Sequence, residues 1–197
     1  PNLSLAIQTA SKAIHSHIYM TATPPRQLIK QMSSHKVIKL PARFHRQPLP
    51  VPHFKHFKLN TSRVQSQLIH LFQAQIKQQR YTLVFFNHIE TMKDAYHKYR
   101  AHIPNLICVY SEDVYRFDKV EALRRGEHSI VFTTTILERG FTMARLDVIV
   151  INAETFSKAA LIQIAGRVGR KMEEPKGLVL FLHEGVSLSM IKAKKDI

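Results

Sequence analysis

From residue 54 onward, short apolar runs typical of strands alternate with longer amphipathic segments typical of helices. Consecutive parallel strands need an intervening helix and a right-handed crossover, so this alternation favours an open, doubly wound parallel sheet with helices on both faces. The predicted fold class is therefore α/β. Strands are expected at 54–59, 81–86, 105–110, 129–134, 147–151 and 177–182, and helices at 62–79, 89–101, 116–125, 157–165 and from 186 onward.

The residues ahead of this domain have a different character. Residues 41–53 contain four prolines, whose fixed φ angles and missing N–H groups exclude a helix or a central strand, so we interpret this segment as a linker. Because the chain opens at Pro1 rather than at a methionine, we expect it to be part of a longer protein. Before the linker we expect a helix, a strand, a helix and a strand at 3–14, 17–20, 25–33 and 36–40. The predicted domain boundaries are 1–40, 41–53 and 54–197.

The charge balance points to a polyanionic partner. Lys and Arg outnumber Asp and Glu by 29 to 14, a formal net charge of +15. Cationic side chains that neutralise phosphates release counterions, which gives salt-sensitive, sequence-independent affinity for nucleic acid. An acidic protein or a membrane surface is the alternative. No signal-peptide pattern or apolar run of roughly 18 residues is present, so we expect a cytoplasmic protein, and Cys108 is expected to pack in the core.

Several polar segments follow predicted strands. In doubly wound sheets, ligands bind just beyond the carboxyl ends of the strands, so we expect these segments to gather at one edge. For each residue taken singly, a turn or a helix cap is the alternative explanation. The four segments are 87–88, 111–113, 133–135 and 166–170.

The segment Gln163-Ile-Ala-Gly-Arg-Val-Gly-Arg170 carries two arginines three residues apart at a predicted helix end. Both guanidinium groups are expected to point the same way, and two permanently charged planar forks suit the oxygens of a triphosphate. Gly166 and Gly169 would let the backbone approach a ligand closely. The alternative is a basic helix end with glycine caps, in which the arginines bind the terminal carbonyl groups.

These segments resemble the motifs of superfamily 2 helicases, in the order that the family shows. Residues 163–170 resemble motif VI and residues 133–140 resemble motif V. The remaining matches are 21–23 to motif III, 83–88 to motif IV, and 110–126 to the segment before motif V. The resemblance implies that the main domain is the second RecA-like domain of a motor, and that residues 1–40 are the end of the first.

Within superfamily 2, the sequence is similar to the bacterial PriA, RecG and ComFA families. Residues 43–52 and 133–140 point most closely to ComFA. That resemblance implies an ATP-driven motor at the cytoplasmic face of the membrane, which draws single-stranded DNA inward during natural competence together with other DNA-uptake proteins. The alternatives are a PriA- or RecG-like helicase in replication restart or recombination, and a non-catalytic nucleic-acid-binding adaptor.

The resemblance also implies roles for single residues. Arg170 would be the arginine finger and Arg167 would contact phosphate. Thr142 stands where many relatives carry an aspartate near the ribose, so no ribose contact is expected there and a DEAD-box RNA helicase is disfavoured. Nucleotide binding or coupling would involve Gln163, Gly166, Gly140, Glu138, Thr21 and Thr23. DNA contacts would involve Thr133, Thr134, Asn87, His88, Ser111 and Arg116.

Parts of an ATP site are absent from the sequence. None of the six glycines is followed by lysine, so there is no G-x-x-x-x-G-K-[ST] loop, and there is no D-E-x-[DH] box for Mg²⁺. We therefore expect ATP and Mg²⁺ to be bound by the longer protein, with this chain alone holding neither tightly and showing negligible ATPase activity. The histidine pairs 15/17 and 53/56 lack cysteine or carboxylate companions, so no metal site is expected.

Overall fold

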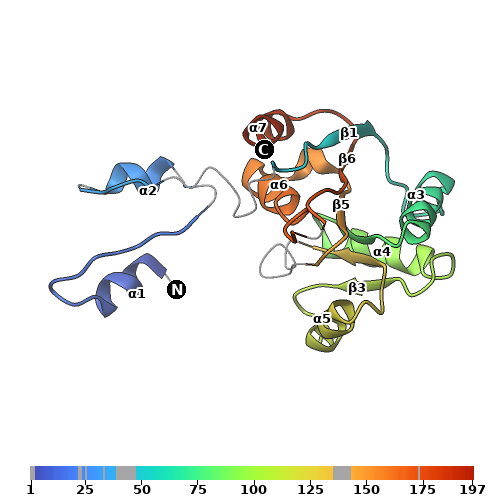
Figure 1. Ribbon diagram of the computed structural model, residues 1–197, viewed down its shortest axis with the longest axis horizontal. Helices are drawn as coiled ribbons and strands as arrows, with labels where there is room; N and C mark the ends of the chain where they lie inside the picture. The colour runs from blue at the N-terminus through green and yellow to red at the C-terminus, as the bar shows by residue number, and fades with distance from the viewer. Residues whose placement is uncertain are drawn as a thin grey trace. The chain divides into compact units, whose positions relative to one another are not determined.

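The computed structural model describes residues 3–21, 24, 26–32, 34–38, 48–134, 143–172 and 174–197. The chain divides into two compact units, Pro1–Ile38 and Lys39–Ile197. The first unit contains two short helices, α1 (Leu3–Ala10) and α2 (Arg26–Gln31) (Figure 1). The predicted linker and domain boundaries stay predictions, since residues 41–47 lie outside the described residues.

Both strands predicted in the first unit are wrong over their described residues. Residues 17–20 and 36–38 have no regular secondary structure. An extended segment is stable only when its N–H and C=O groups pair with a neighbouring strand. Here Ile18 and Met20 are 88% and 92% exposed, so these apolar side chains gain nothing from burial. The first predicted helix also ends early, at Ala10 rather than at residue 14.

The second unit is a six-stranded parallel sheet with the strand order β1-β6-β5-β2-β4-β3. This confirms the predicted doubly wound α/β fold. The strands are β1 (His53–His56), β2 (Tyr81–Phe85), β3 (Ile107–Val109), β4 (Ile130–Thr133), β5 (Leu146–Val150) and β6 (Val179–His183). The helices are α3 (Ser66–Lys77), α4 (Ile89–Tyr99), α5 (Arg116–Arg124), the 3-10 helix η2 (Ala153–Thr155), α6 (Lys158–Ala165) and α7 (Leu188–Asp196).

Alternate residues of each strand face opposite layers of helices. Leu83 and Phe85 of β2 pack with residues of α6 and α7, such as Leu161 and Met190. Val84, one position along, packs on the other face with residues of α3 and α4. Every residue of β4, β5 and β6 is buried, as expected for strands covered on both faces (Figure 1).

One predicted helix boundary shifts for a local reason. The helix expected from residue 62 begins at Ser66, because the preceding residues form a turn closed by side chains. The Asn60 side chain accepts a hydrogen bond from the Ser62 amide at 2.8 Å, and the Gln65 side chain accepts one from the Asn60 amide at 2.8 Å. Such side-chain acceptors compete with the first turn of a helix.

Candidate functional site

Three strand ends lie side by side at the carboxyl edge of the sheet. Thr133 of β4 pairs with Phe85 of β2 on one side and with Val109 of β3 on the other. The loops that follow β2, β4 and β3 therefore start at the same level. The structure thus brings three of the predicted segments together, those beginning at Asn87, Thr133 and Ser111.

Asn87 and His88 follow β2 and are both exposed. The Asn87 side-chain amide donates to the Thr155 carbonyl oxygen at 3.3 Å, which ties the end of β2 to the loop after β5. His88 occupies the N-cap position of α4 with an extended backbone, and its side chain makes no capping hydrogen bond. Its ring is thus presented to solvent at this edge.

The two threonines at the end of β4 differ in their surroundings. The Thr133 side chain is fully buried, and its hydroxyl donates to the Val109 carbonyl oxygen at 2.8 Å. That bond gives Thr133 a structural role between β3 and β4, so the predicted DNA contact at this position rests on the resemblance alone. Thr134 is 9% exposed and lies nearer the surface.

The loop after β3 is fixed by a buried carboxylate. Asp113 accepts from the Tyr115 amide at 3.0 Å and pairs with the Lys119 ammonium at 2.6 Å. Partial burial disfavours the charge of Lys119, but the hydrogen bond and charge of Asp113 outweigh it and raise the lysine pKa. The Arg116 guanidinium donates to the Ser111 carbonyl oxygen at 3.3 Å, so two predicted DNA-binding residues are in contact.

The Gly166–Arg170 segment lies at the opposite edge of the sheet, and the prediction that it shares the carboxyl edge is wrong. A methyl group added at Gly177, just before β6, would lie 2.5 Å from Val168 Cγ1 and 2.7 Å from Asp147 Oδ1, near the start of β5. Helix α6 starts beyond the carboxyl end of β5 and rises about 12 Å over its eight residues, which returns the chain toward the amino ends of the strands.

The two arginines of this segment differ in exposure, and their predicted common direction stays a prediction. Arg167 is 3% exposed, whereas Arg170 is exposed. The Arg170 Nε donates to the Gly166 carbonyl oxygen at 2.7 Å, the contact with a terminal carbonyl that a basic helix end would make. Gly169 has a φ of 66°, in the left-handed region that favours glycine. Gln163 is half-buried on α6.

The remaining predicted site residues lie in the first unit or outside the described residues. Thr21 is exposed in the first unit. Thr23, Glu138 and Gly140 lie outside the described residues, as does Thr142. Within the described part of the chain, no group of three or more His, Cys, Asp or Glu side chains could hold a metal ion. Over the same residues, no helix has the length and apolar character needed to cross a membrane.

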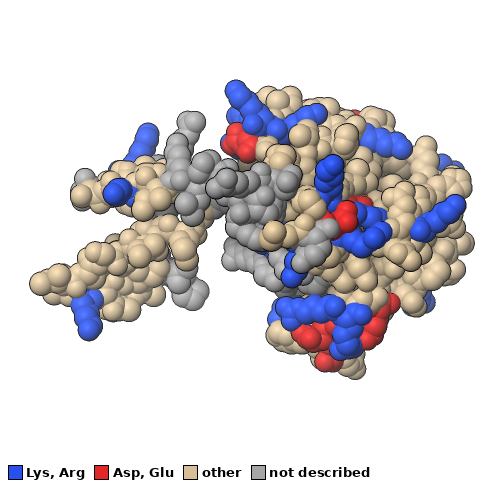
Figure 2. Space-filling view, in the orientation of Figure 1, with Lys and Arg blue, Asp and Glu red and all other residues tan. Residues whose placement is uncertain are grey.

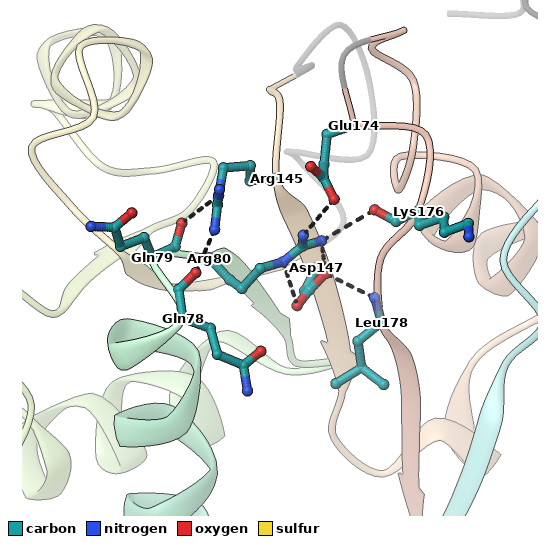
Figure 3. A network of polar contacts seen from close by, with 8 residues as sticks. All are labelled: Gln78, Gln79, Arg80, Arg145, Asp147, Glu174, Lys176 and Leu178. Atoms are coloured by element: carbon teal, nitrogen blue, oxygen red, sulfur yellow. Dashed lines mark hydrogen bonds and ion pairs between the residues drawn. The ribbon is translucent and has the colours of Figure 1, made fainter.

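Sequence reasoning missed an ion-pair network beside the Gly166–Arg170 segment (Figure 3). Arg80, just before β2, pairs with both carboxylate oxygens of Asp147 at 2.5 and 3.1 Å. It also binds Glu174 at 3.1 Å and the Lys176 carbonyl oxygen at 3.2 Å, while Asp147 accepts from the Leu178 amide at 2.8 Å. The only signal in the sequence was an aspartate within the apolar strand 146–150.

The Arg80–Asp147 pair is nearly inaccessible to water. The side chains are 12% and 4% exposed. Burial disfavours the charge of Arg80, but hydrogen bonds to Asp147 and Glu174 and their negative charges prevail and raise the pKa of the guanidinium. The segment after Gly166–Arg170 is therefore attached to the starts of β2 and β5 by charge-assisted hydrogen bonds.

Comparison with known proteins identifies the family. The helicase conserved C-terminal domain matches residues 63–172. The chain belongs to this helicase C-terminal domain family. Competence protein ComFA of Bacillus subtilis (strain 168) is 33% identical over 204 residues, covering 99% of this chain and 44% of that protein. Competence protein ComFA of Streptococcus pneumoniae (strain R6) is 35% identical over 211 residues, covering 100% and 48%.

The chain thus spans about half the length of these curated relatives. Among solved structures, S. cerevisiae Dbp5 bound to RNA and ADP BeF3 has a TM-score of 0.67 at 16% identity, covering 90% of this chain and 48% of that one. RecG bound to a three-way DNA junction has a TM-score of 0.58 at 16% identity, covering 76% and 20%. These structural similarities support the RecA-like fold, and the ComFA matches confirm the resemblance inferred from the motifs.

Proposed function

We propose that this chain is the second motor domain of an ATP-dependent translocase that moves single-stranded DNA during natural competence. The observation that carries the proposal is the similarity to two ComFA competence proteins over essentially the whole chain. The fold, the order of the motifs and the net charge of +15 agree with it. The protein would act at the cytoplasmic face of the membrane with other DNA-uptake proteins.

Part of an ATP site fits the described residues. Arg170 is exposed in the segment after α6, and its Nε donates to the neutral Gly166 carbonyl oxygen, which leaves its positive charge available to an anion at the surface. ATP with Mg²⁺ would supply the phosphoryl-transfer reaction that drives the motor. The described residues hold no group of three or more His, Cys, Asp or Glu side chains that could bind Mg²⁺, and the first RecA-like domain would supply the other wall of the site.

The two arginines would then have separate tasks. Arg170 would stabilise the negative charge that develops on the transferred phosphoryl group, as an arginine finger does. Arg167 is 3% exposed, and the phosphate contact that the motif resemblance implies for it stays part of the proposal.

The decisive experiment compares arginine variants in the longer protein that contains this domain. Arg170→Ala should lower DNA-stimulated ATP hydrolysis by about 10³-fold, because an arginine finger contributes that much to phosphoryl transfer. Arg170→Lys should also lower ATP hydrolysis, since an ammonium group cannot make the paired hydrogen bonds of a planar guanidinium group. Arg125→Ala is the matched control, because Arg125 is exposed and pairs with Glu127 far from α6 in sequence. Normal turnover in Arg170→Ala would refute the assignment.

A further inference from the structure

Helix α7 buries one side and exposes the other. Met190 and Ala193 point to the core and are fully buried. Leu188 and Ile191 are large and apolar, yet they are 71% and 51% exposed. Single exposed apolar residues are ordinary on a protein surface, so these two indicate an interaction site only if they share a surface.

The exposed residues of α7 do share one face. Leu188, Ile191, Lys192 and Lys195 are exposed and stand at positions i, i+3, i+4 and i+7, which a helix brings to the same side. We refer to these four residues as the outer face of α7. The outer face is apolar near the start of the helix and basic near its end.

The acidic residues beside α7 are already paired with lysines of other elements. The Glu184 carboxylate lies 3.4 Å from the Lys58 ammonium, and Asp196 pairs with Lys158 at the start of α6. Glu154 of η2 is half-buried and accepts from the Glu184 amide at 3.4 Å. With the three lysines of α7 itself, five lysines stand against three acids here, so the surroundings of the outer face stay positive.

The lysines of α7 keep their charge available to a ligand. Among the described residues, the side chains of Lys192 and Lys195 make no ion pair. The Lys194 ammonium lies 5.1 Å from the centroid of the Phe54 ring, a contact that leaves its charge in place. Figure 2 shows basic side chains beside acidic ones at the place where Figure 1 draws α7. The outer face therefore combines unpaired positive charge with exposed apolar surface.

We propose that the outer face of α7 binds a membrane surface that carries anionic lipids. Negative headgroups attract lysines that lie near them, and Leu188 and Ile191 would enter the boundary between headgroups and acyl chains. Long lysine side chains keep their ammonium groups among the headgroups while the apolar side chains lie deeper. This inference rests on the proposed function for the presence of a membrane, but α7 lies outside the matched helicase residues 63–172.

The composition of the outer face favours a membrane over other occupants. Nucleic acid offers phosphates to the lysines, but bases stack on aromatic rings, and the face has none. Lysine is depleted at protein interfaces, where Trp, Tyr and Arg supply most of the binding energy. A second copy of this chain is disfavoured by its own net charge of +15.

The test measures binding of the 197-residue chain to vesicles by co-sedimentation at several salt concentrations. Vesicles of phosphatidylcholine with phosphatidylglycerol should bind the chain more tightly than vesicles of phosphatidylcholine alone. Lys192→Gln/Lys195→Gln should weaken binding about 30-fold at low salt, since each lysine near an anionic surface contributes about 5-fold. Lys77→Gln/Lys98→Gln removes the same charge from exposed positions on α3 and α4, and should weaken binding less than about 3-fold.

The apolar half of the outer face is tested separately. Leu188→Ala/Ile191→Ala should weaken vesicle binding about 10-fold at every salt concentration, because less apolar surface enters the membrane. Both positions are exposed and alanine favours a helix, so the fold should be retained. Val114→Ala/Phe117→Ala removes side chains that are 88% and 72% exposed elsewhere, and should bind like the wild type. Because the chain contains no tryptophan, Ile191→Trp adds a single reporter whose emission should shift to the blue on anionic vesicles.

The outcomes are distinguishable. The membrane proposal is refuted if the wild type does not bind anionic vesicles at low salt, or if both double variants of α7 bind them like the wild type. It is also refuted if Leu188→Ala/Ile191→Ala weakens binding to oligo(dT) but not to vesicles, since the face would then bind nucleic acid. The proposed motor function fails by a different result, which is the lack of DNA-stimulated ATP hydrolysis by the longer protein without vesicles.

Discussion

Replacing Asp147 with alanine is expected to be the most damaging single change near the candidate phosphate-binding end of α6. Asp147 accepts hydrogen bonds from Arg80 Nε, Arg80 Nη2 and the Leu178 amide. Its removal would leave the Arg80 charge, in a side chain only 12% exposed, paired with Glu174 alone. Breaking a buried ion pair lowers the free energy of unfolding by about 3–5 kcal/mol. Because Arg80 keeps its contact with Glu174, we expect a loss near the lower end, about 3 kcal/mol.

The Leu178 amide would also lose its acceptor, which adds about 1 kcal/mol. The total of about 4 kcal/mol is a large part of the roughly 5–15 kcal/mol by which domains are stable. In urea denaturation followed by circular dichroism, a slope of about 2 kcal/mol per molar would lower the midpoint by about 2 M. Glu127→Ala, which breaks an exposed pair with Arg125, is the control and should leave the midpoint unchanged.

The double variant Arg80→Met/Asp147→Leu tests the reason for the loss. If the damage comes from an unpaired buried charge, removing both charges should restore most of the stability, because apolar replacements of buried pairs are often neutral or stabilising. The reasoning is refuted if the midpoint of Asp147→Ala lies within about 0.3 M of the wild type. It is also refuted if the double variant is as unstable as the single one.

Two other predictions concern close packing and a buried thiol. Gly177→Ala places its new methyl group 2.5 Å from Val168 Cγ1 and 2.8 Å from Arg80 Nη2. We therefore expect the free energy of unfolding to fall by about 1–3 kcal/mol, which would appear as a lower melting temperature. An unchanged melting temperature would contradict the packing described. Burial raises the pKa of Cys108, with Lys119 opposing it in part, so a thiol reagent at pH 8 should react only after unfolding. The neutral buried thiol stabilises the fold fully below the ordinary thiol pKa, and this stabilisation is lost as pH rises through the raised pKa. The free energy of unfolding of Cys108→Ala should therefore fall less steeply above pH 9 than that of the wild type.

The fold was predictable because its pattern is local and repeated. Apolar strands separated by amphipathic helices have few alternatives to a doubly wound sheet. In β2, Leu83 and Phe85 face one layer of helices and Val84 faces the other, as this fold requires. The strand predictions failed at 17–20 and at 36–38, the described part of 36–40, for the converse reason. Their local pattern is adequate, but no pattern within a segment reveals whether a neighbouring strand is available to pair with it.

The spatial arrangement of the predicted polar segments could be predicted only in part. The polar loops after β2, β3 and β4 share an edge because parallel strands end together. The Gly166–Arg170 segment lies away from that edge because helix α6 carries the chain back toward the amino ends of the strands. Pairing between Arg80 and Asp147, 67 residues apart, and the buried hydroxyl of Thr133 depend on tertiary contacts that spacing in the sequence does not encode.

The placement of the two candidate sites limits how a motor built on this domain could couple them. The loops predicted to bind nucleic acid follow β2, β3 and β4 at the carboxyl edge of the sheet, whereas α6 carries the chain from the end of β5 back toward the other edge, where the proposed arginine finger lies. That helix is N-capped by Ser157, which accepts from the Ala160 amide, and its residues Leu161, Ile164 and Ala165 are completely buried. These buried side chains pack closely against their surroundings, so α6 and the sheet form one packed body. We therefore infer that coupling uses displacement of the whole domain, with Arg170 and the carboxyl-edge loops moving together relative to the rest of the protein.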